Sequence, residues 1–274
     1  MKCLISGGAG FIGSHLVEEL VKRGHEVTVI DNLCKGFKEN IPDGVKLIEN
    51  DIRNEQVYPE ADVVFHLAAR KSVPDSFEEP HDFFSTNIDG TWNILEAYKG
   101  TRIVAISSSS AEFCASPYAI TKKTGEYLCD LFPNTVSLRF YNVFGERQPD
   151  TGAVVPAFCN KILNDAAPVI FGDGSHSRDY TYVKDVVNEV IEYGIGSKNQ
   201  LTGPHSMGYG TSYSVNSLVK LINEELDKSV EATYVQDREG DVPFTQSPTL
   251  FTDVKYGFKE GMKRTIKYWK ELLA

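Results

Sequence analysis

Short apolar runs alternate with amphipathic stretches along the first half of the chain. The apolar runs are CLIS, EVTVI, VKLIE, DVVFHLA, RIVAIS and TVSLRFY. Helical patterns lie between them, from about Phe11, over 82–98 and from Pro117. Strands that alternate with helices form βαβ units, in which helices cover both faces of a parallel sheet. The pattern therefore predicts a doubly wound, Rossmann-like α/β fold.

The order of elements is looser beyond Asn142. Helical patterns separated by Gly- and Pro-containing loops are predicted over 153–164, 183–193, 214–227 and 260–272. No repeat or flexible linker divides the chain, so we expect two lobes that exchange segments. The expected domains are a cofactor domain over 1–142, completed by segments near 178–207, and a smaller mixed α/β substrate lobe over 143–274.

The composition fits a compact globular protein, because 41% of the 274 residues are hydrophobic and 24% are charged. The net charge of −10 argues against nucleic acid as a partner, since phosphate backbones bind concentrated positive charge. The cysteines show no CxxC pair and no metal-ligand spacing with the histidines, so no metal site is expected. The strand-like start MKCLIS and the absence of a bilayer-length apolar run predict a cytoplasmic protein without membrane contact.

A glycine-rich loop follows the first predicted strand and opens directly into a helix. The segment GGAGFIG, residues 7–13, satisfies the GxGxxG pattern. Its glycines permit a tight turn, and the helix N-terminus offers N–H groups and partial positive charge to a pyrophosphate. The residues expected to contact the cofactor here are Gly7, Gly10, Phe11, Ile12 and Gly13.

An acidic residue, Asp31, ends the second predicted strand. A carboxylate at this place accepts hydrogen bonds from the adenosine ribose and repels a 2′-phosphate, which favours NAD over NADP. Lys35 would offset part of that repulsion. After the third strand, Asp51 and Ile52 are placed to border the adenine. The predicted cofactor is NAD.

Two Tyr-x-x-x-Lys pairs occur, Tyr118/Lys122 and Tyr180/Lys184. Only the first pair follows a Ser-rich strand end, and Ser116 before a proline predicts the start of a helix there. The second pair begins in the alternating, strand-like run RDYTYV. A tyrosine that acts as a base near pH 7 needs a pKa lowered by about 3 units, which a lysine and an oxidised nicotinamide would provide. We therefore expect Tyr118 and Lys122 to be catalytic.

Linked motifs in order resemble the extended short-chain dehydrogenase/reductases, and within them the UDP-sugar 4-epimerases. From Met1 to about Tyr268 they are GGAGFIGS, DNL, HLAA, the Ser-rich strand end, SPYAITK, RFYNVFGERQ, VVPAF, FGDGSHSRDYTYV, GYGTSYSVNSL and REGDVP. The resemblance implies an NAD-dependent 4-epimerisation of a UDP-sugar through a transient 4-keto intermediate.

The resemblance also assigns residues to the two ligands. It implies further cofactor contacts at Asn32, Leu67, Ala68, Ala69, Lys71 and Asn87. It implies substrate contacts at Ser108, Ser109, Asn142, Val155, Phe171, Arg178, Arg238, Asp241 and Thr245. Arginines facing a diphosphate would supply the local positive charge that this acidic chain otherwise lacks. The modest size of Thr245 leaves room for an N-acetyl group on the sugar.

Two alignments of the Ser-rich strand end compete for the catalytic serine. The strand register counted from Arg102 places it at Ser108, whereas matching Phe113-Cys114 to the usual Tyr-Gly of the family places it at Ser109. We expect Ser108 to be the catalytic hydroxyl.

The chain departs from the family pattern by being short. Ser108 and Tyr118 are only ten positions apart, where family members have a much longer segment, and 246–258 also looks abbreviated. Shortening would open the cleft, alter specificity or abolish activity. Glu112, two residues after Ser110, leaves a second reading open, a nucleotide-sugar 4,6-dehydratase or UDP-glucuronate decarboxylase. A third reading is a non-catalytic NAD-binding regulator that lost its chemistry along with the loop.

The resemblance further implies a homodimer in which the helices over 82–98 and 117–131 pack into a four-helix bundle. Phe83, Phe84, Leu128 and Leu131 provide apolar side chains for that surface. The same side chains would alternatively face the core.

Overall fold

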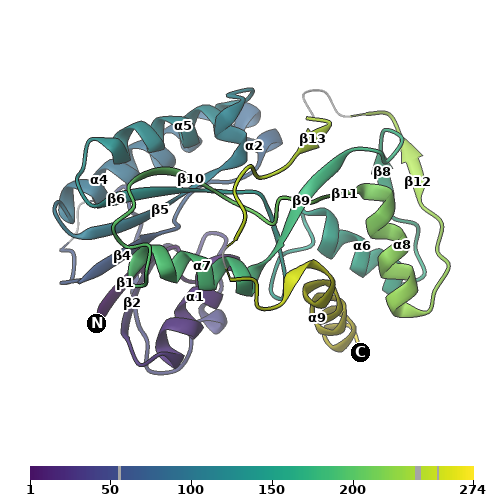
Figure 1. Ribbon diagram of the computed structural model, residues 1–274, viewed down its shortest axis with the longest axis horizontal. Helices are drawn as coiled ribbons and strands as arrows, with labels where there is room; N and C mark the ends of the chain where they lie inside the picture. The colour runs from purple at the N-terminus through teal and green to yellow at the C-terminus, as the bar shows by residue number, and fades with distance from the viewer. Residues whose placement is uncertain (55–56, 238–241, 252) are drawn as a thin grey trace. The chain divides into compact units, whose positions relative to one another are not determined.

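The computed structural model describes residues 1–54, 57–237, 242–251 and 253–274 (Figure 1). In it the chain folds into two compact units. The first unit comprises Met1–Phe140 and Val187–Ser206, and the second comprises Tyr141–Val186 and Met207–Ala274. Each unit is thus built from two separate stretches of chain. The assignment of one unit to the cofactor and the other to the substrate stays a prediction.

The first unit contains most of the regular elements. Its strands are β1 (Lys2–Ser6), β2 (Glu26–Asp31), β3 (Lys46–Glu49), β4 (Val63–His66), β5 (Arg102–Ser108), β6 (Thr135–Phe140) and β10 (Gly203–Met207), which ends at the unit boundary. Its helical segments are α1 (Phe11–Lys22), η1 (Lys38–Asn40), α2 (Val73–Glu78), α3 (Pro80–Phe84), η2 (Ser85–Asp89), α4 (Gly90–Ala97), η3 (Ser109–Glu112), α5 (Pro117–Asp130) and the larger part of α7 (Val183–Gly194).

Within the described residues these strands form a seven-stranded sheet in the order β10-β6-β5-β4-β1-β2-β3. The pairs from β6 across to β3 are parallel, and the strand order reverses at the neighbours β1 and β4. Helices α4 and α5 cover one face, while α1 and α7 cover the other (Figure 1). The predicted doubly wound α/β fold is confirmed.

The central strands are apolar on both faces because helices cover both faces. Every residue of β4 is buried, and Phe65 is fully enclosed. Leu4, Ile30 and Leu95 belong to a buried cluster on one side of the sheet. Burying each such side chain contributes about 1.5–3 kcal/mol to folding. The sheet is therefore a rigid base for the loops at its edge.

Four polar side chains stand at the carboxyl ends of neighbouring strands, namely Ser6, Asp31, His66 and Ser108. Doubly wound sheets bind ligands at this edge, beside the point where the strand order reverses. Ser6 Oγ lies 2.6 Å from His66 Nδ1, and Thr91 Oγ1 lies 2.9 Å from His66 Nε2. Burial lowers the pKa of His66 to about 3, so the imidazole is neutral and serves as a structural bridge.

The second unit contains a smaller mixed sheet and its helices. They are β7 (Asn142–Phe144), α6 (Val154–Leu163), β8 (Val169–Phe171), β9 (Ser177–Tyr182), β11 (Ser212–Ser214), α8 (Val215–Leu226), β12 (Thr233–Val235), β13 (Phe244–Thr245) and α9 (Gly257–Leu272). Strand β9 pairs antiparallel with β11 and parallel with β7 and β13, while β8 pairs parallel with β12.

The buried carboxylate of Asp185 organises the start of α9 in this unit. It accepts hydrogen bonds from the Tyr209 hydroxyl at 2.5 Å and from the N–H groups of Lys255, Tyr256 and Gly257 at 2.8–3.1 Å. These N–H groups have no intrahelical acceptor because they lie at the helix N-terminus. The helix therefore begins at Gly257, three residues before the position expected from the sequence pattern.

The helix expected over 82–98 contains a wider turn. The chain follows α3, then the π-helical turn η2, and then α4 without leaving the helical region. Such π turns are rare and recur at functional positions. Here the turn contains Asn87, one of the residues implied in cofactor binding.

The apolar residues proposed for a helix-bundle surface divide into two groups. Phe83 is fully buried and its ring packs edge-on against Tyr118, with centroids 6.2 Å apart. Leu128 packs against the buried cluster beside the sheet. Phe84 and Leu131 are exposed. Only the last two residues therefore present apolar surface, because the helix face carrying the others is turned to the core.

All five cysteines are free thiols, and Cys3, Cys129 and Cys159 are buried. Burial raises the pKa of each of these three thiols, which keeps them protonated at neutral pH. In the part of the chain that the structure describes, no helix is both long and apolar enough to cross a bilayer.

Candidate active site

The glycine-rich loop between β1 and α1 is folded so tightly that two of its glycines have no room for a side chain. Gly7 has φ +76°, and a Cβ there would lie 2.7 Å from the Ala68 nitrogen. A Cβ on Gly13 would lie 2.1 Å from the Gly7 carbonyl oxygen. The loop therefore packs against its own helix and against the segment that follows β4.

The N-terminus of α1 is open to an anion. Gly10 is its N-cap residue, with no side-chain cap and no acidic residue in the first turn. The first N–H groups of the helix, beginning with Phe11 and Ile12, have no intrahelical acceptor and carry the positive end of the helix dipole. A Cβ on Gly10 would meet only the Gly7 oxygen, at 3.3 Å. This glycine cradle fits the pyrophosphate of a dinucleotide.

Asp31 is tied to the same loop by both carboxylate oxygens. Oδ2 accepts the N–H of Ala9 and Oδ1 accepts the N–H of Leu33, each at 2.9 Å. A carboxylate can accept about four hydrogen bonds, so capacity remains for ribose hydroxyls. The predicted ribose contact thus requires no rearrangement of Asp31.

Asp51 is engaged by a partner that sequence reasoning missed. Its oxygens accept Nε and Nη2 of Arg53 at 2.9 and 2.8 Å, the Arg53 N–H at 2.9 Å, and the Asn32 amide at 2.8 Å. The hydrogen bonds from Arg53 lower the pKa of Asp51 to about 2. Four donors fill the carboxylate, so an adenine amino group must compete with Arg53. The neighbouring Ile52 side chain is buried in the core.

Asn87 braces the loop after β4 against the helix that carries Tyr118. Its side-chain oxygen accepts the N–H of Arg70 at 2.7 Å. Its amide nitrogen donates to the Arg70 carbonyl and to Thr121 Oγ1, both at 3.0 Å. Asn87 is only 3% exposed. These contacts orient the loop residues Leu67, Ala68 and Ala69 beside the glycine cradle, where Gly7 packs against Ala68.

Two lysines place positive charge around the glycine cradle. The pKa of Lys71 is lowered by desolvation and by the nearby charge of Lys35, although the Lys71 side chain reaches solvent. Lys35 precedes Gly36, whose close contact with Ala9 joins this segment to the glycine-rich loop. The local charge favours an anionic ligand in a protein that is acidic overall.

Ser108, Tyr118 and Lys122 are brought together at the end of β5. Ser108 is the last strand residue, and Tyr118 lies in the first turn of α5, which the Ser116 hydroxyl caps by accepting the Ala119 N–H at 3.2 Å. The Ser108 and Tyr118 side chains lie close enough for hydrogen bonding between them to lower the pKa of Tyr118. Lys122 follows one helical turn later, and its Nζ donates to the carbonyl of Ile106 at 2.8 Å. Ser109 instead begins the turn η3.

The electrostatics of this group are set by burial. Burial raises the pKa of Tyr118, and the hydrogen bond with Ser108 opposes that rise. Burial lowers the pKa of Lys122 to about 8, while Cys129 and Glu126 oppose the change. At neutral pH Lys122 is still mostly protonated. Tyr118 needs further positive charge beside it before it can act as a base.

The second Tyr-x-x-x-Lys pair has a different environment. Tyr180 is buried in β9, with 2% of its surface exposed. Lys184 donates to Glu146 at 2.9 Å, and Glu146 also accepts the Tyr182 hydroxyl. These residues hold the second unit together rather than forming a tyrosine and lysine pair on one helix face.

Candidate substrate residues of the second unit lie on its small sheet. In the ladder, Arg178 of β9 is opposite Tyr213 of β11 on one side and Thr245 of β13 on the other. Asn142 opens β7 and pairs with Tyr180 of β9. The sheet therefore gathers three of the predicted substrate contacts around one strand.

The remaining predicted contacts differ in accessibility. Val155 is buried in α6 and contributes to the core, whereas Phe171 ends β8 and is partly exposed. The Thr245 hydroxyl oxygen is buried and has no hydrogen-bond partner among the described residues. Arg238 and Asp241 lie outside the described residues.

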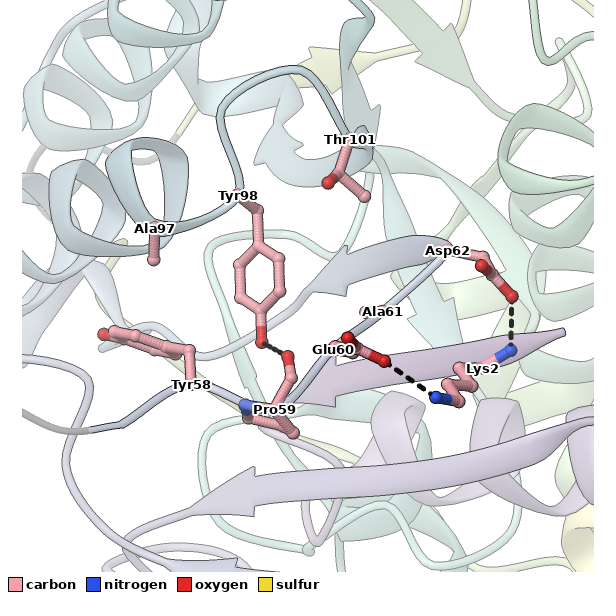
Figure 2. A pocket seen from close by; sticks show the side chains of 9 residues that line it. All are labelled: Lys2, Tyr58, Pro59, Glu60, Ala61, Asp62, Ala97, Tyr98 and Thr101. Carbon is pink, nitrogen blue, oxygen red and sulfur yellow. Dashed lines mark hydrogen bonds and ion pairs between the residues drawn. The ribbon is translucent and has the colours of Figure 1, made fainter.

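A surface hollow of about 460 Å³ lies at the opposite, amino-terminal edge of the large sheet (Figure 2). It is lined by Lys2, Tyr58, Pro59, Glu60, Ala61, Asp62, Ala97, Tyr98 and Thr101. Its charged groups pair with one another, because Lys2 Nζ contacts Glu60 at 2.9 Å and the Lys2 N–H donates to Asp62 at 2.7 Å. None of the predicted site residues lines it.

Known proteins with similar sequences are nucleotide-sugar enzymes. The sequence profile of the NAD dependent epimerase/dehydratase family matches residues 3–192. The putative UDP-glucose 4-epimerase of Methanocaldococcus jannaschii is 33% identical over 302 residues, covering 97% of this chain and 98% of that protein. The UDP-N-acetyl-alpha-D-glucosaminuronate decarboxylase of Bacillus cytotoxicus is 30% identical over 318 residues, covering 99% of this chain and 98% of that protein.

A solved structure shares the whole fold. The UDP-N-acetylglucosamine 4-epimerase of Methanobrevibacter ruminantium, in complex with UDP-N-acetylmuramic acid, matches with a TM-score of 0.91 and 30% identity, covering 99% of this chain and 98% of that one. Both sequence alignments are longer than the 274 residues of this chain, so both relatives contain residues without a counterpart here.

Because burial lowers the pKa of Lys122, the charged form of this lysine lowers the free energy of unfolding of the protein. Below pH 8 the folded and unfolded states both carry the proton, so the penalty for burying the charge is fully present. Between pH 8 and 10.5 only the unfolded state keeps it, and the folded protein gains stability as pH rises. We expect Lys122→Met to raise the free energy of unfolding at pH 7 by about 1–3 kcal/mol, with the gain shrinking toward pH 10.5.

Urea unfolding at pH 7 and at pH 10 measures this difference. Lys22→Met is the matched control, because 74% of the Lys22 side chain is exposed and its removal should leave stability unchanged at both pH values. Equal or lower stability of Lys122→Met at pH 7 would contradict the assignment of a buried, destabilising charge.

Proposed function

The chain belongs to the NAD-dependent epimerase/dehydratase family, and on that premise we propose that it interconverts two UDP-sugars by inverting carbon 4. The observation that carries the proposal is that Ser108, Tyr118 and Lys122 lie together at the end of β5, at the same sheet edge as the open cradle of α1. The relatives named as UDP-glucose and UDP-N-acetylglucosamine 4-epimerases support this choice.

In the proposed reaction Tyr118 takes the proton of the sugar 4-hydroxyl. The ammonium of Lys122 stabilises the phenolate, and the Ser108 hydroxyl orients the reacting oxygen. When bound, NAD supplies the acceptor for the hydride of carbon 4, returns that hydride later and contributes a positive charge in its oxidised form. The 4-keto sugar must turn over in the site before carbon 4 regains hydrogen on its other face. Tyr118 then returns the proton to the 4-oxygen, and because the hydride also returns to carbon 4 the sugar undergoes no net oxidation.

A decarboxylase or dehydratase is the second candidate, and the Bacillus cytotoxicus relative favours it. In that reading Glu112 would assist the loss of carbon dioxide or water. Its carboxylate is ion-paired with Arg139 Nη1 at 3.2 Å, which holds it away from the role of a free acid or base. We therefore rank this reading below epimerisation. A non-catalytic NAD-binding regulator ranks third, because the catalytic group is intact despite the short connection.

We also propose that two copies pair through α4 and α5, which pack against each other. Large apolar side chains on these helices and at the end of α3 are exposed: Phe84, Trp92, Ile120, Tyr127 and Leu131. In a monomer these apolar side chains stay in contact with water, which is unfavourable, whereas a second copy of the chain would bury them. The cytoplasmic location expected from the sequence stays a prediction.

Tyr118→Phe tests the proposed chemistry. The purified protein is incubated with NAD and UDP-glucose, UDP-galactose, their N-acetyl counterparts, UDP-glucuronate and dTDP-glucose, and products are followed by NMR and mass. We expect interconversion at constant mass and a loss of rate of at least about 100-fold in the variant, because no group remains to move the proton. A loss of mass would identify the decarboxylase or dehydratase, and NAD binding without any product would support the regulator.

Thr245→Tyr tests the sugar specificity. We propose that Thr245, which is paired with Arg178 in the ladder and whose hydroxyl has no partner among the described residues, borders the 2-substituent of the sugar. A tyrosine there should lower kcat/KM for UDP-N-acetylglucosamine by roughly 10-fold or more and leave UDP-glucose within about 2-fold, since only the larger substituent loses its space. Equal losses for both sugars would show that Thr245 does not border this group.

Leu131→Asp tests the dimer. Leu131 is 69% exposed, so the change leaves the fold of a single chain intact. A charge within the proposed apolar interface should shift the protein to monomer in sedimentation velocity at micromolar concentration. Glu96→Gln is the control, because this exposed side chain of α4 should leave the sedimentation coefficient unchanged. A wild-type protein that sediments as a monomer would refute the proposal.

A further inference from the structure

A single guanidinium joins two carboxylates that flank the candidate catalytic residues. Arg139 lies in β6, opposite Ser107 of β5 in the sheet register. Its Nε and Nη2 donate to the Glu126 oxygens at 2.7 and 2.8 Å, and its Nη1 donates to Glu112 Oε1 at 3.2 Å. Glu112 ends the turn η3 and Glu126 lies in α5. Arg139 therefore ties that turn and that helix to the same strand.

Glu126 and Arg139 form a buried ion pair in which both oxygens of the Glu126 carboxylate accept hydrogen bonds. Glu126 is 2% exposed and also accepts Ser107 Oγ at 2.7 Å and Lys123 Nζ at 3.1 Å. Burial opposes its ionisation, but the hydrogen bonds from Arg139, Ser107 and Lys123 outweigh burial and lower the pKa of Glu126. The carboxylate is thus ionised at neutral pH. Buried ion pairs with all hydrogen bonds made favour one geometry of the elements that carry them.

Apolar packing does not complete the contact between α5 and the sheet. A void of about 20 Å³ lies between them, with a wall that is mostly apolar but includes the polar residues Ser107, Lys122 and Glu126. A void of this size has room for one water molecule, for which these polar residues would be the partners. Because protein interiors are otherwise densely packed, a void beneath a helix leaves its position dependent on specific polar contacts.

The short connection increases this dependence. Between Ser108 and Tyr118 the chain has only the turn η3 and a few residues, including Cys114 at φ +50°. No additional loop is present there to hold the two ends in place. Arg139 holds this segment at two points, because Glu112 lies between Ser108 and Tyr118 and Glu126 lies one helical turn after Lys122.

We propose that Arg139 is a positioning residue, which clamps η3 and α5 so that the Ser108 hydroxyl stays within hydrogen-bond distance of Tyr118. The expected effect of the clamp on kcat rests on the proposed function, whereas its effect on the contact between Ser108 and Tyr118 does not. Displacing a catalytic group by about 1 Å can lower a rate by roughly 100-fold. Within the described residues, Ser108 faces the Tyr118 hydroxyl, Cys129 and Glu126 face the Lys122 ammonium, and that ammonium in turn faces His66.

Two variants release the clamp from its two sides. Glu112→Ala removes the partly exposed carboxylate and should fold normally. The double variant Glu126→Gln/Arg139→Gln removes both buried charges together, which is tolerated better than leaving one charge unpaired. We expect kcat to fall about 3- to 10-fold in the first variant and about 10- to 100-fold in the second, with KM for the UDP-sugar within about 2-fold. The control Glu260→Ala breaks the exposed pair with Arg264 in α9 and should change neither constant.

A thermodynamic cycle with Ser108→Ala separates positioning from general loosening. If the clamp acts through Ser108, adding Glu112→Ala to Ser108→Ala causes no further loss of kcat, because the hydroxyl to be positioned is already gone. Arg139→Lys keeps one positive charge but cannot bridge both carboxylates as the guanidinium does, so partial activity is expected.

The readout that needs no turnover is the ionisation of Tyr118 in the NAD-bound protein. It is followed by ultraviolet difference titration of the phenolate, with the titration of Tyr118→Phe subtracted. Loss of the Ser108 hydrogen bond should shift this titration to higher pH in Glu112→Ala and in Ser108→Ala alike, with no additional shift when both are combined. A shifted titration in a protein that converts no sugar would uphold the clamp and reject the proposed function.

Three results would overturn the clamp. The first is that Glu112→Ala keeps the wild-type titration curve of Tyr118 and the wild-type kcat. The second is that the losses of kcat caused by Glu112→Ala and Ser108→Ala multiply fully when the two changes are combined. The third is that the double variant loses activity only because it unfolds, while Glu112→Ala keeps normal activity. Each result would assign Arg139 to stability alone.

Discussion

The site depends on the burial of both faces of the parallel sheet. Because helices cover β4, β5 and β1 on each side, a slip of one residue in any register would disrupt the close packing of the apolar side chains on both faces against those helices. The register is therefore strongly specified, and with it the places of Ser6, His66, Ser108 and Arg139 at or near the carboxyl ends of the strands. The chemistry at this edge follows from that constraint.

Polar contacts between strand ends and helices complete what apolar burial begins. His66 links β1 to α4 through Ser6 and Thr91. Asn87 links the loop after β4 to α5. Arg139 links β6 to η3 and α5. Each of these contacts is directional, so together they fix positions that non-directional hydrophobic packing leaves free, especially where a void lies under α5.

The short connection between Ser108 and Tyr118 does not separate these residues. The Ser108 side chain is close enough to Tyr118 to lower the pKa of its hydroxyl, and Lys122 lies one turn further along the same helix. Relatives that are longer than this chain include enzymes named as epimerases and as a decarboxylase. Removing residues from a loop alters what covers a site more readily than it alters the strand and helix ends that form it. The assembled group is the reason to treat the chain as an enzyme.

The sequence by itself determined the sheet, the glycine cradle and the Tyr118/Lys122 pair, because hydrophobic periodicity, glycine spacing and helix caps are local properties. Only the tertiary structure decided that Arg53 forms hydrogen bonds with the Asp51 carboxylate and that Asn87 connects the loop after β4 to α5. It also decided that the Phe83 ring is buried in the core and that Arg139 contacts both Glu112 and Glu126. These contacts join residues that are distant in the chain, or depend on which side of a helix meets the sheet. Their side-chain types carry no local signal of a partner, so only packing could reveal them.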